Sequence, residues 1–149
     1  MENALEIYRE QLARRELGNL TGVLASHGLA LTEEDVSSLL ELRRAALGNA
    51  GRVELGGGAL PKLAQAFCDS PYVDRQNFPT VLGELQDAFY YYKTECHDQF
   101  SDEELIEYMV RVFNGPAEGS AELLCGLSLE ELCRWARNGG KISFEEGMY

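Results

Sequence analysis

Apolar residues recur at intervals of three and four along most of this chain, the spacing that gathers side chains on one face of an α-helix. In residues 2–26, one side of the predicted helix collects Leu5, Tyr8, Leu12, Leu20 and Val23. The same spacing predicts a second helix from after Thr32 to near Gly48 and three more over 59–68, 79–97 and 102–114. Two shorter helices are expected on either side of Gly126. The Gly18-Asn19 pair is where we expect the first helix to bend or split.

Three of these helices are expected to begin with the same signature. A hydroxyl residue stands before an acidic run at Thr32, Ser101 and Ser128, and an acid follows three residues later each time. In this arrangement the hydroxyl accepts from a free N–H of the first turn, and the acid reaches back to the cap residue. Negative charge also lies at the positive end of the helix dipole. The pattern therefore predicts capped helix starts at these three positions.

Two short stretches, 52–55 and 141–144, alternate in the manner of β-strands. They are predicted to pair as a minimal two-stranded β-ribbon. The fold class predicted from the whole pattern is all-α, a compact bundle of five to seven helices in a single domain, 1–149. A chain of 149 residues with 45% hydrophobic residues is long enough to bury a core without disulfides or a metal.

The chain is strongly acidic, with 25 acidic and 13 basic residues and a net charge of −12. Such a surface repels phosphate backbones, so no nucleic-acid partner is expected, whereas a basic partner is compatible with it. The first residues lack the basic start and apolar run of a secretory signal. No stretch approaches the ~20 apolar residues that span a bilayer. We expect a cytoplasmic protein that does not associate with membranes.

Thiol and metal chemistry find little support in the sequence. The four cysteines, Cys68, Cys96, Cys125 and Cys133, include no C-x-x-C pair and lie in or beside apolar helical stretches. Cys96 and His97 are neighbours, but on a helix Cys96 would point into the core and His97 outward. The acids at 98 and 102–104 lack an EF-hand loop and are interpreted as solvated, with a carboxylate site as the alternative. No catalytic residue, metal or cofactor is predicted.

Arg43 is the residue that departs most from the helical pattern. It lies within the apolar stripe of the second predicted helix, where a leucine would be expected. A charge there must be paired, extend to solvent or line a pocket. The first interpretation is an ion pair, with Glu54 as a candidate partner. The alternative is that Arg43 binds an anionic ligand.

The glycine run at 56–58 precedes a predicted helix, a setting in which backbone N–H groups bind anions. The spacing fits neither a P-loop nor a dinucleotide fingerprint, because Pro61-Lys62-Leu63 stands where those motifs need other residues. A sharp turn with positive φ is the preferred explanation. If a ligand pocket exists here, its candidate residues are Arg43, Arg52, Glu54, Gly57 and Lys62.

The run Phe89-Tyr90-Tyr91-Tyr92 covers every side of one predicted helix. Phe89 and Tyr92 belong to its apolar stripe, whereas Tyr90 and Tyr91 do not. Tyrosine is enriched at protein interfaces. The candidate contact face for a protein partner or a second copy is Tyr90, Tyr91, Thr94 and His97. The alternative is that another helix of the same domain covers the two tyrosines.

Three segments, GRVELGGG (51–58), FCDSPY (67–72) and FYYYK (89–93), resemble an uncharacterised family of small proteins from anaerobic Gram-positive bacteria. The resemblance covers most of the chain. It implies a bacterial cytoplasmic protein and supplies no functional residues. The first functional hypothesis is therefore a non-enzymatic protein-interaction or regulatory module. The alternative is a protein or enzyme that binds a small anionic ligand near Arg43, Glu54 and the glycine run.

Overall fold

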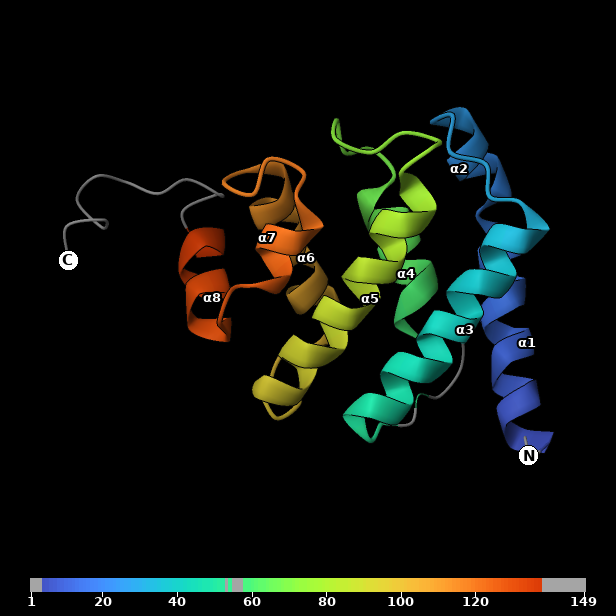
Figure 1. Cartoon of the computed structure of the whole chain (residues 1–149), viewed down its shortest axis with the longest axis horizontal. Helices are drawn as coiled ribbons and strands as arrows, with labels where there is room; N and C mark the ends of the chain where they lie inside the picture. The colour runs from blue at the N-terminus through green and yellow to red at the C-terminus, as the bar shows by residue number, and fades with distance from the viewer. Residues whose placement is uncertain (1–3, 53, 55–57, 138–149) are drawn as a thin grey trace.

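The structure is a computed structural model and describes residues 4–52, 54 and 58–137. In this part of the chain there are eight helices: α1 (Ala4–Asn19), α2 (Thr21–Ser26), α3 (Glu33–Ala50), α4 (Ala59–Phe67), α5 (Phe78–Glu95), α6 (Asp102–Asn114), α7 (Ala121–Cys125) and α8 (Leu129–Arg137). They form an elongated row with α1 and α8 at opposite ends (Figure 1). None of these helices is both long enough and apolar enough to cross a bilayer.

The predicted all-α class is confirmed, but the prediction of five to seven helices was too low. The extra helix arises where the first predicted helix divides at Leu20, next to the Gly18-Asn19 pair. The β-ribbon is not supported. Gly51 takes a left-handed conformation (φ 65°), and Arg52 N–H donates to Leu47 O (2.9 Å). That bond closes the C-terminus of α3 and removes an N–H that a strand would use. The second predicted strand, 141–144, lies outside the described residues.

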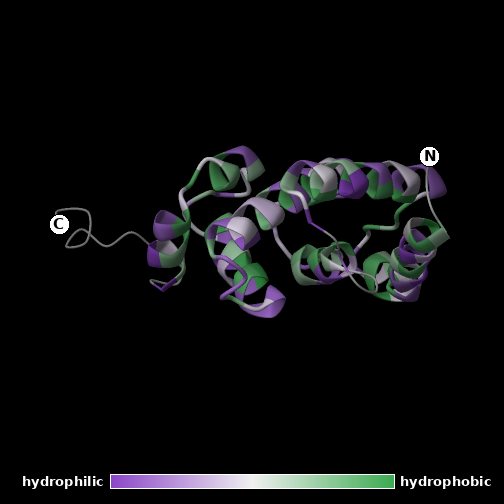
Figure 2. Cartoon of the chain, turned by 90° about the horizontal axis from the view of Figure 1, so that it is seen from below, coloured by the Kyte–Doolittle hydropathy of each residue, from purple (hydrophilic) through white to green (hydrophobic). Residues whose placement is uncertain are grey.

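Helix α5 lies at the centre of the hydrophobic core. It packs against α3, α4, α6 and α7, and its large side chains Phe78, Phe89 and Tyr92 are fully buried. The Tyr92 hydroxyl donates to Leu124 O at the end of α7 (2.6 Å). Apolar and polar residues alternate along the helices, as expected where one side of a helix is buried (Figure 2). A helix with neighbours on so many sides must be apolar over most of its surface.

All three predicted capping signatures are confirmed. The Thr32 hydroxyl accepts from Asp35 N–H (3.0 Å), and the Asp35 carboxylate accepts from Thr32 N–H (2.9 Å). Ser101 exchanges the same two bonds with Glu104 at the start of α6. Ser128 does so with Glu131 at the start of α8. These reciprocal bonds fix where the three helices begin.

We expect Ser101→Ala and Ser128→Ala each to lower the free energy of unfolding by about 1 kcal/mol, because each removes a cap acceptor. Urea denaturation followed by circular dichroism measures the effect. Ser38→Ala is the matched control, since Ser38 is exposed within α3 and caps nothing. That control should be neutral or slightly stabilising. Neutral results at both caps would contradict the boundaries of α6 and α8.

Candidate functional site

Arg43 and Glu54 form a buried ion pair, which confirms the first interpretation of Arg43. The Arg43 side chain is only 3% exposed, and its Nε donates to Glu54 Oε1 at 3.0 Å. The other oxygen, Glu54 Oε2, accepts from Ala59 N–H at 3.0 Å. Ala59 is the first residue of α4, where unpaired N–H groups and the helix dipole favour negative charge. One carboxylate therefore neutralises a buried guanidinium and caps a helix.

Gly58 makes room for this carboxylate. Its φ is +72°, and a Cβ at this position would collide with the Glu54 carboxyl group. The predicted sharp turn is thus confirmed at Gly58, while Gly56 and Gly57 lie outside the described residues. The N-terminus of α4 already holds an anion from the protein itself. Gly58 serves this internal contact, in agreement with the failure of the sequence to match phosphate-binding motifs.

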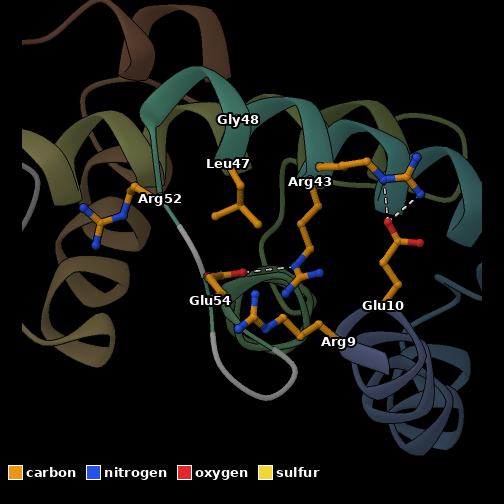
Figure 3. A pocket seen from close by; sticks show the side chains of 8 residues that line it. Arg9, Glu10, Arg43, Leu47, Gly48, Arg52 and Glu54 are labelled. Carbon is orange, nitrogen blue, oxygen red and sulfur yellow. Dashed lines mark hydrogen bonds and ion pairs between the residues drawn. The ribbon is translucent and has the colours of Figure 1, made fainter. Parts of the chain in front are cut away.

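A cavity of about 230 Å³ lies beside the ion pair, between α1, α3 and the connection to α4. The residues that line it are Arg9, Glu10, Arg43, Arg44, Leu47, Gly48, Arg52 and Glu54. The lining holds four arginines and two glutamates, in a chain of net charge −12. Because Arg43, Arg44 and Arg52 pair with Glu54, Glu10 and Asp98, Arg9 leaves one excess positive charge. Figure 3 shows the side chains of Arg9, Arg43 and Leu47 directed into this space. The cavity is a local reversal of the overall charge.

Two guanidinium groups in the cavity keep donors that the protein does not use. Arg43 Nη2 is buried and has no hydrogen-bond partner in the structure. Arg9, from α1, points toward the same space and forms no ion pair with any described residue (Figure 3). A buried N–H without an acceptor costs free energy.

Tyr90 adds a second buried polar atom close to the ion pair. Its hydroxyl has no hydrogen-bond partner, and its side chain is 2% exposed. Burial and then the nearby charge of Glu54 raise the pKa of Tyr90 well above its ordinary value. The hydroxyl therefore stays protonated and can only serve as a neutral donor or acceptor.

The structure brings together only some of the candidate ligand residues. Arg43 and Glu54 are in contact, and Arg52 lines the cavity but directs its guanidinium away, to an ion pair with Asp98 (Figure 3). Lys62 lies elsewhere, where it pairs with Glu103 (3.0 Å) between α4 and α6. Gly57 lies outside the described residues. The pocket near Arg43 therefore has a different composition from the predicted one.

Arg9, Glu10 and Arg44 were missed by the sequence analysis. Arg44 Nε donates to Glu10 (2.6 Å), and Arg14 pairs with Glu33 (3.2 Å), so two ion pairs join α1 to α3. The sequence does show that the first two long helices carry charges of opposite sign that could pair. These charges alone could not predict the pairing, because the spacing of residues within one helix does not show which other helix packs against it.

The acidic turn before α6 is neutralised by basic side chains from other elements. Lys93 Nζ lies 2.8 Å from Asp102 Oδ1, and Lys62 Nζ lies 3.3 Å from Asp102 Oδ2. Partial burial by itself would raise the pKa of Asp102, but Lys93 and Lys62 outweigh it and lower the pKa. The predicted solvation holds for Asp98, Glu103 and Glu104, which are exposed, whereas Asp102 is partly buried between two lysines. Within the described residues, no group of three or more His, Cys, Asp or Glu is placed to hold a metal ion.

The predicted exposure of Tyr90 was wrong, because α3 packs over that side of α5. The alternative interpretation, that another helix of the domain covers the tyrosine, is correct for Tyr90.

The other candidate interface residues are exposed. Tyr91 is 45% exposed, and Thr94 is exposed beside it. His97 is exposed beyond the end of α5, in a left-handed conformation (φ 52°). Cys96 is buried as expected, so the two neighbours point apart. An interface at the three exposed residues stays a prediction.

All four cysteines are free thiols. Cys125 lies beside α5, and burial, reinforced by the charges of Glu84 and Asp87, raises the pKa of its thiol to about 11. A thiol with this pKa is protonated near neutral pH and is a poor nucleophile. The environment of Cys125 therefore does not favour thiol catalysis.

Comparison with known proteins identifies one family. A family model described as a family of unknown function, DUF6323, matches residues 16–142. The match confirms the resemblance to an uncharacterised family and covers α2 to α8 and part of α1. Neither the curated proteins nor the solved structures contain a match to this chain. The function must therefore be argued from the site.

We expect Arg43→Leu to destabilise the protein by about 3–5 kcal/mol, because it leaves the Glu54 carboxylate without its buried partner. The double variant Arg43→Leu with Glu54→Gln should recover part of this loss, since the amide oxygen can still accept from Ala59 N–H. Urea denaturation compares both with Arg14→Leu, which breaks an exposed ion pair and should cost less than about 1 kcal/mol. An Arg43→Leu variant as stable as the wild type would contradict a stabilising pair.

We expect Asp102→Asn to destabilise the protein at pH 7, with a difference that narrows in acid. The folded-state pKa of Asp102 is lowered, so its stabilising contribution is present above the unfolded pKa of about 3.9. It is lost as the pH falls through the folded-state value. Urea denaturation at pH 7 and at about pH 3 measures the difference in stability between wild type and variant. The control is Glu130→Gln, which removes an acidic residue from the first turn of α8. A difference that is constant with pH would contradict the assignment.

Proposed function

We propose that this chain, which belongs to the family of unknown function DUF6323, is a binding protein for a small anion. The observation that carries the proposal is Arg43, which lines the cavity and whose buried Nη2 has no hydrogen-bond partner. Arg9 faces the same cavity from α1. Two cationic groups from different helices thus converge on one space that the protein leaves unfilled.

The chemistry of the lining favours an oxyanion. A guanidinium presents parallel N–H donors that match the oxygens of a carboxylate or phosphate, and such charge-assisted bonds are strong when water is excluded. Leu47 adds an apolar surface on one side. The volume of about 230 Å³ is below the roughly 300–1,000 Å³ of pockets for drug-sized ligands. A small carboxylate or inorganic phosphate therefore fits better than a nucleotide.

The same lining supports binding more than catalysis. Arginines remain protonated and only donate. The Glu54 carboxylate is held by Arg43 and by Ala59 N–H. A general base needs a free lone pair that faces the substrate. Between the two hypotheses from the sequence, we therefore place anion binding before a protein-interaction module, because burial removes Tyr90 from the proposed contact face.

A thermal-shift screen tests this function with phosphate, acetate, succinate and citrate as probes. A probe present at a hundredfold excess over its Kd should stabilise by about 2.7 kcal/mol and raise the Tm by roughly 5–10 °C. Arg9→Gln should abolish the rise, because it removes one donor without disturbing the Arg43–Glu54 pair. Arg43→Ala is less informative, since it is expected to destabilise the fold.

Arg15→Gln is the matched control. Arg15 lies on the same helix, is exposed and does not line the cavity, so its loss gives the same change in net charge. The rise should persist in this variant. Equal rises in wild type and Arg9→Gln, or no rise with any probe, would contradict anion binding at this cavity.

A further inference from the structure

A groove runs along the outer side of the contact between α3 and α5. The two helices lie side by side and run in the same direction (Figure 1). Two clefts of about 430 and 270 Å³ lie end to end between them and share Asp87. The clefts extend along α5 from Pro79 to Glu95, a length of about 24 Å at 1.5 Å per residue. This length accommodates about four turns of a helix.

The groove is uniformly acidic. Glu84, Asp87 and Glu95 are spaced so that one side of α5 carries all three, and no lysine or arginine lines either cleft. Unlike the acids around Asp102, these three carboxylates have no ion pair with any described residue. Burial raises the pKa of Asp87 above its ordinary value, so its charge is already costly in the free protein. Cationic groups in the groove would lower that cost.

The same groove exposes two large apolar side chains. Leu42 from α3 is 46% exposed, and Tyr91 from α5 is 45% exposed. Gly83 allows Leu42 to lie close against α5, since a Cβ there would come within 2.8 Å of Leu42 Cδ1. Surfaces that recognise other proteins commonly combine exposed apolar side chains with a charged rim.

We propose that this groove binds a basic, amphipathic helical segment of another protein. Its apolar side would contact Leu42 and Tyr91, and its lysines or arginines would pair with Glu84, Asp87 and Glu95. Charge complementarity favours such a partner over a second copy, because each copy carries a net charge of −12. The proposal does not depend on anion binding, since the arginine cavity shares no lining residue with the groove.

A fluorescein-labelled amphipathic helical peptide of leucine and lysine is the probe, and fluorescence anisotropy measures its binding to the full chain. One control peptide replaces every lysine with glutamate. A second keeps the composition but spreads the leucines over all sides of the helix. We expect saturable binding of the amphipathic basic peptide, weakened by salt, and about tenfold weaker binding of each control.

Two double variants locate the site. Glu84→Gln with Asp87→Asn should weaken binding about tenfold, whereas Glu16→Gln with Glu130→Gln removes the same charge on α1 and α8 and should have little effect. Leu42→Ser with Tyr91→Ser should weaken binding by a similar factor. Both residues are about half exposed, and an unchanged Tm will show that the fold persists.

Three results would overturn the proposal. Equal weakening by the two charge variants would show non-specific attraction to an acidic protein. Full binding by the Leu42→Ser with Tyr91→Ser variant would show that the groove supplies no apolar contact. If sedimentation shows a dimer that the Leu42→Ser with Tyr91→Ser variant abolishes, the groove binds a second copy of the chain and not another protein. A failure of anion binding would leave all three readouts unchanged, so the two proposals are tested separately.

Discussion

The structure depends on the burial of α5 on almost every side. Helices α3, α4, α6 and α7 all pack against it, and its side chains form the centre of the core. Removing this much apolar surface from water is the main favourable term in folding. Two polar side chains of the centre are tied to neighbouring backbone: the Tyr92 hydroxyl donates to Leu124 O, and the Gln86 amide donates to Leu39 O. Each such bond also fixes how a neighbouring helix lies on α5.

The Arg43–Glu54 pair joins three parts of the fold. It links α3 to the connection after it and, through Ala59 N–H, to the start of α4. Gly58 is needed because no side chain fits where the carboxylate folds back. A buried charge without its partner is strongly unfavourable. The same requirement explains why a carboxylate occupies the helix start that resembles an anion-binding loop in the sequence.

Helix α3 separates two surfaces of opposite charge. Arg43 and Arg44 face the cavity shared with α1, while Asp35 and Leu42 face the groove shared with α5. A net charge of −12 averages over this division and describes neither surface. The local potentials, and not the total, determine what each surface can bind. The two proposed sites, one for an anion and one for a basic segment, therefore lie on different sides of a single helix.

The sequence by itself determined the all-helical class and the positions of most helices. The helical spacing, the three capping boxes and the glycine turn depend on residues within a few positions of one another, so local chemistry was enough to predict them. It also predicted the Arg43–Glu54 pair, because a charge on an apolar stripe needs a partner and Glu54 follows close along the chain. The tertiary structure alone decided which sides of the helices are covered. Tyr90 is buried because α3 lies over it, and Arg9 reaches the cavity because α1 packs beside α3. Periodicity defines the faces of one helix, but the number and direction of its neighbours come from long-range packing.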